Sequence, residues 1–181
     1  MKVVVTIPAF NEERTIGKAI HDVKEALPKS TILVVDDGSR DATQETARKL
    51  GAAVISHPSN LGLGETFRTE MKEALKLEAD AIVHIDADGQ YRANDIPALL
   101  KPIIEKKADL VLGSRFLGHI ESMPLLKRLG NRAFSIVVSG VAGKKITDAQ
   151  TGFRAFTPAV ARLLISSSHT YTQEQIIRAA K

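Results

Sequence analysis

The sequence predicts an α/β fold of three layers, in which a mostly parallel central sheet lies between helices. Short runs rich in β-branched residues alternate along the chain with longer amphipathic stretches. The runs VVVTI, ILVV, AIVHI and DLVLG are apolar almost throughout, which is typical of strands covered on both faces, as in a parallel sheet. Connections of this length between parallel strands imply right-handed crossovers.

Five strands and four helices are expected to alternate in the first part of the chain. The expected strands span residues 2–7, 31–35, 52–56, 81–86 and 109–113. The expected helices span residues 13–27, 41–50, 63–77 and 95–106. Pro28 and Gly51 end the first two helices, because both residues commonly follow the last helical turn. Beyond residue 115 the alternation lapses, and we expect a helix over 124–140, a short segment over 152–157 and two further helical pieces.

The composition is that of an ordinary globular protein with one domain. The chain has 181 residues, of which 44% are hydrophobic and 25% charged. The absence of cysteine excludes disulfides, thiolate metal sites and a cysteine nucleophile. The net charge of +4 comes from dispersed basic residues, and aromatic residues make up only 4%, which argues against a nucleic-acid surface.

Neither a signal peptide nor a membrane span is predicted. No segment reaches the roughly 18 apolar residues of a spanning helix, and the apolar N-terminal run stops at Pro8. We therefore expect a cytoplasmic protein that is at most peripheral to a membrane. The chain stops inside the helical pattern 173–181 without a C-cap, so we expect residues 1–181 to be a single domain, truncated at its C-terminal end.

Polar clusters follow four of the expected strands. They are Pro8-Ala-Phe-Asn-Glu12, Asp36-Asp-Gly-Ser39, Asp86-Ala-Asp88 and Gly113-Ser-Arg115. In open α/β sheets, ligands bind beyond the carboxyl ends of the strands. We therefore expect the functional site at this edge of the sheet.

Asp86 and Asp88 are the candidate metal ligands. Their i, i+2 spacing points both side chains the same way on an extended backbone, with Cα atoms about 6.5–7 Å apart. Two carboxylates held this close repel each other unless a cation lies between them, and hard oxygen ligands suit Mg²⁺ or Mn²⁺. Gln90 is a further candidate ligand. The alternative is that Asp86 ends the strand and Asp88 forms a turn with Gly89; at a strand end we favour the metal site.

Asp37 and the loop 60–64 are candidates for binding a nucleotide. A carboxylate at Asp37 can accept hydrogen bonds from a ribose hydroxyl or a base N–H, although a turn or helix cap is the alternative. Gly62 and Gly64 precede a helix with Arg68 one turn in, and helix N-termini favour anions. Taken alone, this loop is more often a simple turn. Neither G-x-G-x-x-G nor a P-loop motif occurs.

Arginines and amides gather late in the sequence. Arginine matches phosphate geometry with two parallel hydrogen bonds, although any single arginine is more often a solvated surface residue. The candidates are Arg115, Arg128, Arg132 and Arg154, together with the stretch Asp148-Ala-Gln-Thr151. We expect His84 to be a satisfied strand histidine, and the five histidines show no metal-ligand spacing.

Taken in order, these motifs resemble those of the family 2 glycosyltransferases of GT-A fold. The branch that they resemble most is that of the dolichyl-phosphate mannose synthases and polyprenyl-phosphate glycosyltransferases, and the similarity runs from residue 3 to about 180. The motifs that carry it are Pro8-Ala-Phe-Asn-Glu12, Val35-Asp-Asp-Gly-Ser39 with Asp41, Asn60-x-Gly-x-Gly64, Asp86-Ala-Asp-Gly-Gln90, Gly113-Ser-Arg115, Arg128-x-x-Asn131 and Asp148-x-Gln-Thr-Gly-Phe-Arg154.

The resemblance implies roles for particular residues. The nucleotide pocket would be lined by Pro8, Ala9, Asn11, Glu12 and Asp37. The diphosphate would be approached through a divalent metal, Mg²⁺ or Mn²⁺, held by Asp86 and Asp88 with Gln90 as a further ligand. Ala87 would belong to the residues that bind the nucleotide. Arg115 would contact the acceptor phosphate or the donor sugar, and the transferred sugar would lie near Asp148, Gln150 and Thr151.

The resemblance also implies an inverting transfer from a nucleotide-diphospho-sugar. A lipid phosphate acceptor is already anionic and needs only positioning by arginines, whereas a sugar hydroxyl would need Asp148 to remove a proton. The arginines near the late motifs favour a polyprenyl (dolichyl-type) phosphate as acceptor. The alternatives are transfer to a saccharide hydroxyl and a non-catalytic nucleotide-sugar-binding module. The donor remains open among GDP-mannose, UDP-glucose and UDP-N-acetylglucosamine.

Four further points bear on the resemblance. Glu65 stands where relatives usually have alanine, and relatives continue past residue 181. The apolar stretch 125–141 could face a lipid or membrane, but we favour core packing. A nucleotidyltransferase would share the layered sheet and the acidic site, but should carry a Gly-rich basic loop where Pro8-Ala-Phe-Asn-Glu12 stands.

Overall fold

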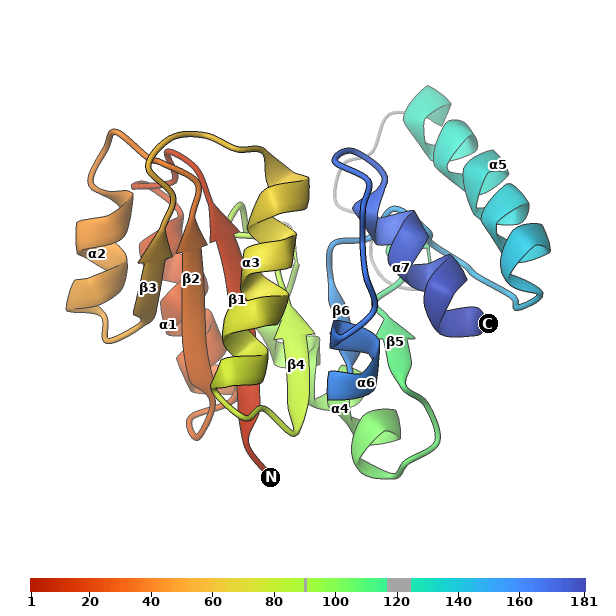
Figure 1. The fold of residues 1–181 in the computed structure, drawn as a ribbon, viewed down its shortest axis with the longest axis horizontal. Coiled ribbons are helices and arrows are strands. Elements are labelled where there is room, and N and C mark those ends of the chain that lie inside the picture. The colour runs from red at the N-terminus through yellow and green to blue at the C-terminus, as the bar shows by residue number, and fades with distance from the viewer. Residues whose placement is uncertain (90, 117–124) are drawn as a thin grey trace.

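One six-stranded sheet organises the part of the chain that the computed structural model describes, residues 1–89, 91–116 and 125–181 (Figure 1). Its order is β3-β2-β1-β4-β6-β5. The strands are β1 (Val3–Ala9), β2 (Thr31–Asp36), β3 (Ala53–Ser56), β4 (Ala81–His84), β5 (Leu110–Leu112) and β6 (Arg154–Phe156). Neighbours among β1–β4 pair in parallel, while β6 is antiparallel to both β4 and β5. The prediction of a mostly parallel sheet is confirmed.

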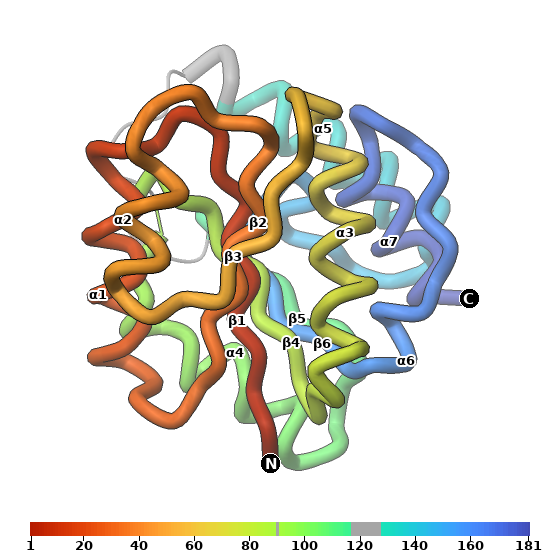
Figure 2. The backbone as a smooth tube through the Cα atoms, turned by 60° about the vertical axis from the view of Figure 1, so that its left-hand side comes forward, coloured from red at the N-terminus to blue at the C-terminus, as the bar shows by residue number. Residues whose placement is uncertain are grey.

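Helices cover both faces of this sheet (Figures 1 and 2). One face packs against α1 (Ile16–Ala26), α2 (Thr43–Lys49) and α4 (Ile96–Ile104), which follows the short helix η1 (Ala93–Asp95). The other face packs against α3 (Leu63–Lys76), α6 (Pro158–Ala161) and α7 (Tyr171–Ala180). The predicted three-layer architecture is therefore confirmed.

The core follows from two periodicities in the sequence. Along β1, Val3, Val5 and Ile7 belong to one apolar cluster, whereas Val4 belongs to the cluster on the opposite face. This is the period of two that a strand gives its side chains. In α1 the buried residues Ile16, Ile20 and Val23 recur at helical spacing and pack on the first face.

Helix α5 (Leu125–Ala142) lies beside α7 at the end of the molecule near β5 and β6 (Figure 1). Its residue Val138 packs against Ala149 and Ile176 in a third small apolar cluster. The opposite side of α5 is exposed, so the expected core packing of this stretch holds for one face of the helix and is wrong for the other. Among the described residues, no helix combines the length and the apolar character that a membrane crossing requires.

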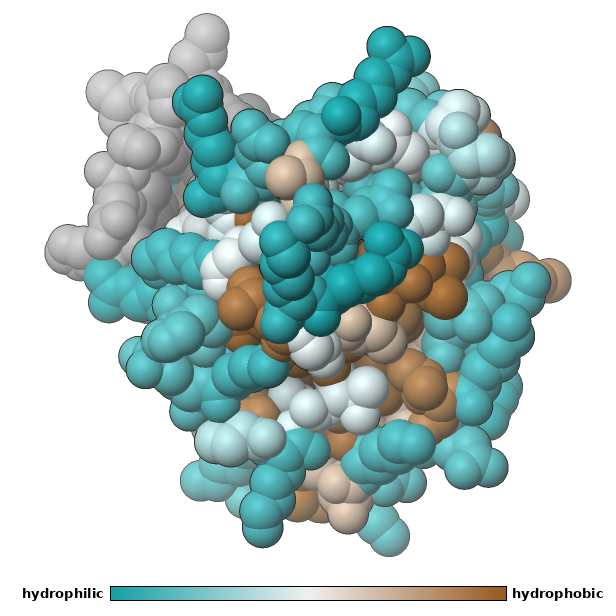
Figure 3. All heavy atoms as spheres, turned by 90° about the vertical axis from the view of Figure 1, so that its left-hand side faces the viewer, coloured by the Kyte–Doolittle hydropathy of each residue, from teal (hydrophilic) through white to brown (hydrophobic). Residues whose placement is uncertain are grey.

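The opposite end of the molecule is polar. At the β3 edge, hydrophilic side chains dominate the surface and hydrophobic atoms show between them (Figure 3). The edge strand β3 itself is short and largely exposed.

Candidate functional site

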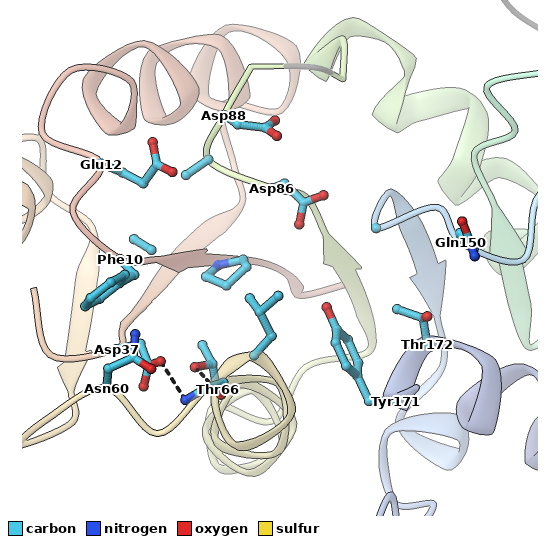
Figure 4. Close-up of a pocket in the computed structure, with 16 residues that line it drawn as sticks. Phe10, Glu12, Asp37, Asn60, Thr66, Asp86, Asp88, Gln150, Tyr171 and Thr172 are labelled. Atoms are coloured by element: carbon cyan, nitrogen blue, oxygen red, sulfur yellow. Dashed lines mark hydrogen bonds between the residues drawn. The ribbon is translucent and has the colours of Figure 1, made fainter. Parts of the chain in front are cut away.

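A cavity of about 530 Å³ opens at the carboxyl ends of the parallel strands (Figure 4). Three groups of side chains surround it. Glu12, Asp86 and Asp88 lie together, and Gln150, Tyr171 and Thr172 come from the late part of the chain. The remaining group, which includes Phe10, Asp37, Asn60 and Thr66, comes from the loops after β1, β2 and β3 and from the start of α3. The lining residues are Pro8, Ala9, Phe10, Glu12, Asp37, Asn60, Gly62, Leu63, Thr66, Asp86, Ala87, Asp88, Gln150, Gly152, Tyr171 and Thr172.

The end of β1 supplies the first part of the wall. Pro8 and Ala9 are the last strand residues, and Glu12 follows in the loop. Asn11 has a left-handed backbone (φ 55°) and is not a lining residue. Its amide N–H donates to Ser39 Oγ (2.8 Å), and its Oδ1 accepts from the Arg40 amide (2.9 Å). Asn11 therefore fastens one loop to the next, which differs from the pocket-lining role expected of it.

Asp37 organises the neighbouring loop. It is buried, and its two carboxylate oxygens accept hydrogen bonds from the amides of Leu61 (2.9 Å) and Gly62 (2.8 Å), while His57 Nδ1 lies 2.7 Å from Oδ1. Gly62 has φ +88°, a conformation that glycine adopts without strain. Asp37 thus both lines the cavity and sets the path of the loop that closes it.

Gly64 and Arg68 do not face the cavity, contrary to the expected contact with phosphates. The Cα of Gly64 lies against the backbone of Ser168, where a Cβ would come within 2.7 Å. Arg68 pairs with Glu65 (2.7 Å), and it also donates to the carbonyls of Ile165 and Ser167. Glu65, where the resemblance led us to expect alanine, is thus explained as the ion-pair partner of Arg68. The two hydrogen bonds from Arg68 to the carbonyls of Ile165 and Ser167 hold α3 to the segment before α7.

Asp86 and Asp88 follow β4 and both line the cavity (Figure 4). The strand ends at His84, two residues earlier than expected, because its ladder with β1 stops at the Thr6–His84 pair. Burial would raise the pKa of Asp86, but His84, Arg154 and Arg115 outweigh it and hold that pKa below its usual range. Gly152 packs directly on the Asp86 carboxylate, leaving no room there for a Cβ.

These carboxylates fit a hard divalent cation. Asp86 is held in its ionised form, and Asp88 reaches the same cavity. Among the described residues, Asp86, Asp88 and Glu12 do not bring three ligand atoms within 4.8 Å of one another. A pair of carboxylates completed by ligand oxygens and water is how proteins commonly hold Mg²⁺. Gln90, the third expected ligand, lies outside the described residues.

A buried ion pair lies beneath Asp86. His84 is 1% exposed and Glu70 is fully buried, with Nδ1 and Oε2 2.9 Å apart. His84 Nε2 lies 3.7 Å from Asp86 Oδ1 and has no hydrogen-bond partner among the described residues. Burial would lower the pKa of His84, but the charges of Glu70 and Asp86 raise it to about 9. His84 is thus a charged residue under the cavity, more than the satisfied strand histidine we expected.

Asp148 and Arg115 form a second buried pair. Arg115 Nε and Nη2 donate to the two Asp148 oxygens at 2.7 and 2.9 Å, and the Arg115 and Gln150 amides donate to the same carboxylate. Asp148 is fully buried and does not line the cavity. In this arrangement its carboxylate is the acceptor of an ion pair and is not placed to take a proton from a ligand. Asp148 instead holds Arg115, whose side chain is 20% exposed.

The remaining late residues divide between the cavity and its support. Gln150 lines the cavity, whereas Thr151 is buried and accepts from the Phe153 amide. Arg154 is fully buried and donates to the Thr172 carbonyl and Gln175 Oε1, so it supports the wall from behind. Arg128 and Arg132 are exposed on α5 and do not line the cavity.

Several lining residues carry no motif that would have identified them. Tyr171 and Thr172 begin α7, which the fold brings to the cavity from the end of the chain. Thr66 lies on the first turn of α3. Phe10 and Asn60 stand inside motifs that we had singled out, so their neighbours gave a signal for them. On its acidic side, the cavity suits an anion that binds through a metal cation. Its other sides offer amide, hydroxyl and aromatic groups.

Comparisons with known proteins agree with this geometry. Residues 4–163 match the family described as Glycosyl transferase family 2. An uncharacterised protein of Methanocaldococcus jannaschii is 38% identical over 99% of this chain and 76% of its own. The UDP-N-acetylglucosamine–dolichyl-phosphate N-acetylglucosaminyltransferase of Methanococcus voltae is 32% identical over 90% of this chain and 72% of its own.

The solved structures show the same fold. Glucosyl-3-phosphoglycerate synthase from Mycobacterium tuberculosis, in complex with phosphoglyceric acid, superposes with a TM-score of 0.69 and 24% identity over 88% of this chain. This chain spans 57% of the length of that structure. The same synthase has also been solved with Mn²⁺, UDP and glucosyl-3-phosphoglycerate. The expected fold class is confirmed.

Proposed function

The chain belongs to glycosyltransferase family 2, in the branch with the polyprenyl-phosphate enzymes, and from that premise we propose the reaction that it catalyses. It transfers a sugar, with inversion, from a nucleotide-diphospho-sugar to a polyprenyl phosphate of dolichyl type. An acceptor phosphate oxygen forms a bond to the anomeric carbon as the bond to the nucleotide diphosphate breaks, which releases a nucleoside diphosphate. Residues 1–181 belong to the catalytic domain of this reaction.

The donor occupies the cavity at the strand ends. Phe10, Asn60 and Asp37 lie on the side where a nucleoside fits, and the acids lie where its diphosphate would follow. Asp86 and Asp88 would hold Mg²⁺ or Mn²⁺, which neutralises the charge of the departing diphosphate. The Mn²⁺ and UDP complex of a synthase with the same fold supports this assignment.

One observation carries the choice of a phosphate acceptor. The carboxylate that a hydroxyl acceptor would need as its base, Asp148, is fully buried and held by Arg115 through two hydrogen bonds. A phosphate acceptor is already anionic and needs no such base. The Arg115 side chain stays 20% exposed, and an arginine suits a phosphate oxygen. The dolichyl-phosphate acceptor in the name of one relative supports the same choice.

Such an acceptor places the enzyme at the cytoplasmic face of a membrane, and α5 is the surface that we assign to it. The helix buries Asn131, Ser135 and Val138 against the domain and exposes an apolar face on the other side. That face comprises Leu129, Phe134, Ile136, Val137 and Val141. Exposed cations flank it, and residues 125–147 contain no acid, so the surface complements anionic lipid. The exposed cations are Arg128, Arg132, Lys144 and Lys145.

The acceptor is tested by offering two acceptors side by side. Purified protein with Mn²⁺ is given radiolabelled GDP-mannose, UDP-glucose or UDP-N-acetylglucosamine, together with either polyprenyl phosphate or an oligosaccharide. We expect label to enter the lipid fraction only. Label in the oligosaccharide alone would overturn the proposed acceptor.

The donor is tested by a thermal-shift screen of the same nucleotide sugars with and without Mn²⁺, since a ligand that binds the native state raises its apparent stability. We expect one base to give a shift that depends on Mn²⁺. Binding without turnover in the transfer assay would show a nucleotide-sugar-binding module and would overturn the catalytic proposal.

A further inference from the structure

Three titratable groups lie in a row under the acidic side of the cavity. Glu70 comes from α3, His84 from the end of β4, and Asp86 from the segment that follows. His84 lies between the two acids, with Nδ1 2.9 Å from Glu70 Oε2 and Nε2 3.7 Å from Asp86 Oδ1. Of the three, Asp86 alone lines the cavity.

The inner two members are poorly explained by stability. Glu70 is fully buried, which raises the pKa of its carboxyl, and His84 is 1% exposed, so both titratable groups are removed from water. Buried ion pairs seldom stabilise a fold more than apolar residues of similar size would, because desolvation offsets their attraction. The surrounding core offers such neighbours, since Phe67 packs edge-on against the His84 ring with centroids 5.4 Å apart. A pair of titratable groups at this position therefore points to a role in the site.

The surroundings of the His84 ring indicate what that role is. His84 Nδ1 lies near Glu70 Oε2 and, at 3.4 Å, near Thr6 Oγ1, while Nε2 lies on the side of Asp86, and Phe67 packs against the ring. Gly152 packs on the Asp86 carboxylate. The carboxylate is therefore confined by His84 and Gly152. Partners of this kind, behind a carboxylate that binds a metal, fix its orientation and raise metal affinity.

We propose that Glu70 and His84 are positioning residues, which orient the Asp86 carboxylate toward the cavity for its divalent cation. Glu70 acts indirectly, by holding the His84 ring in the orientation that faces Asp86. The proposal rests on the proposed function in one respect, namely that Asp86 binds the cation of the donor diphosphate. It adds two residues that do not touch the donor themselves.

The test measures metal binding separately from nucleotide binding. Mn²⁺ is titrated into protein with UDP or GDP, and free Mn²⁺ is followed by electron paramagnetic resonance. Nucleotide affinity in EDTA is measured by calorimetry as the reference. Glu70→Gln is expected to weaken Mn²⁺ by about tenfold, the lower end of the range for such partners, and to leave the metal-free nucleotide affinity unchanged. The control is Glu73→Gln on the same helix, which removes a surface pair with Lys76 and should change neither value.

A second variant covers the case in which Glu70→Gln fails to fold. The double change Glu70→Leu with His84→Met removes both charges together, which is commonly neutral or stabilising. We expect this variant to keep the wild-type melting temperature and to lose the same tenfold in Mn²⁺ affinity. A loss of metal affinity without a loss of stability is a result that a merely structural pair would not give.

The outcomes separate this inference from the proposed function. Wild-type Mn²⁺ affinity in the double variant would overturn the positioning role while leaving metal-assisted donor binding intact. An equal fall in Mn²⁺ affinity and metal-free nucleotide affinity would also overturn it, because that indicates a general change in the cavity. If the wild type itself shows no Mn²⁺-dependent nucleotide binding, both proposals fail.

Discussion

The two walls of the cavity are held in place by different interactions. The first wall comprises the loops after β1 and β2 and the loop 60–62, where backbone amides donate to the side chains of Asp37, Ser39 and Asn11. The second wall comprises residues 148–154 and the start of α7, where buried charges join distant segments, as in Arg115–Asp148. The first wall therefore depends on backbone conformation, and the second on compensation of buried charge. Each should fail under a different kind of substitution.

The largest effect on stability is expected from the second wall. Arg115→Met would leave the fully buried Asp148 carboxylate without its cation. Loss of one partner of a buried ion pair commonly costs about 3–5 kcal/mol, and we expect about 3 kcal/mol because Arg115 is partly exposed. The free energy of unfolding in urea measures this change.

The control for this prediction is Arg128→Met, which removes an exposed arginine from α5 and should leave the unfolding free energy within about 0.5 kcal/mol. Equal values for the two variants would mean that the Arg115–Asp148 pair is not what holds the second wall.

The first wall should break at a glycine. Gly38 has φ +76°, and a Cβ there would lie 2.5 Å from the Ser59 backbone. Gly38→Ala therefore combines left-handed strain with a backbone clash, and we expect a loss of about 2 kcal/mol. Because Ser59 precedes the loop that Asp37 holds, affinity for the nucleotide should fall as well. Calorimetry with UDP and GDP measures this second effect.

Gly140→Ala is the matched control, since nothing lies within 4 Å of a Cβ at that position on the exposed side of α5. It should be neutral or slightly stabilising, as alanine is the better helix former. Normal stability and nucleotide affinity in Gly38→Ala would show that the first wall adapts without loss.

The contrast between the walls also marks what the sequence could predict. Local motifs at strand ends identified Pro8, Glu12 and Asp37 as lining residues. This was possible because the residues at and directly after the end of a strand lie at the edge of the sheet where ligands bind. They gave the wrong surroundings for Gly64 and Arg68, whose partners come from the segment 165–168, about a hundred residues away. A motif does not show which distant segment will pack against it.

For the second wall, the sequence predicted which residues take part better than it predicted how they contact one another. Asp148 and Arg115 were both expected at the site, yet their mutual pairing, which removes Asp148 from the cavity, is a tertiary contact. The same holds for the sheet. The short segment around Phe156 was expected, but its antiparallel insertion between β4 and β5 depends on long-range pairing. That insertion brings Gly152 onto Asp86.

A smaller, pH-dependent effect is expected at the start of α7. Burial would raise the pKa of Glu174, but hydrogen bonds from Ser167, Arg178 and Ser166 lower it to about 2. Because the folded pKa lies below the unfolded value of about 4.5, the contribution to stability is full above pH 4.5 and is lost as the pH falls toward 2. Glu174→Gln should cost about 1 kcal/mol at pH 7.

Urea unfolding of the wild type and of Glu174→Gln between pH 7 and pH 3 checks this prediction. The difference between the two proteins should shrink below pH 4.5. Glu25→Gln, which changes an exposed carboxylate on α1, is the control and should show little difference throughout. A difference that stays constant down to pH 3 would contradict the role given to Glu174.

The smallest effect on stability is expected from substitutions on the exposed face of α5, which should nevertheless clearly weaken membrane binding. Ile136 and Val137 are 72% and 62% exposed, so the double change Ile136→Ser with Val137→Ser should alter the unfolding free energy by about 0.5 kcal/mol or less. Membrane affinity grows with buried apolar area, and we expect at least about tenfold weaker sedimentation with vesicles of anionic lipid.

Leu164→Ser removes another exposed side chain away from α5 and should leave vesicle binding unchanged. Equal losses in both variants would mean that general hydrophobicity drives the binding. No loss in either would remove α5 from the membrane contact while leaving the cavity and its two walls as described.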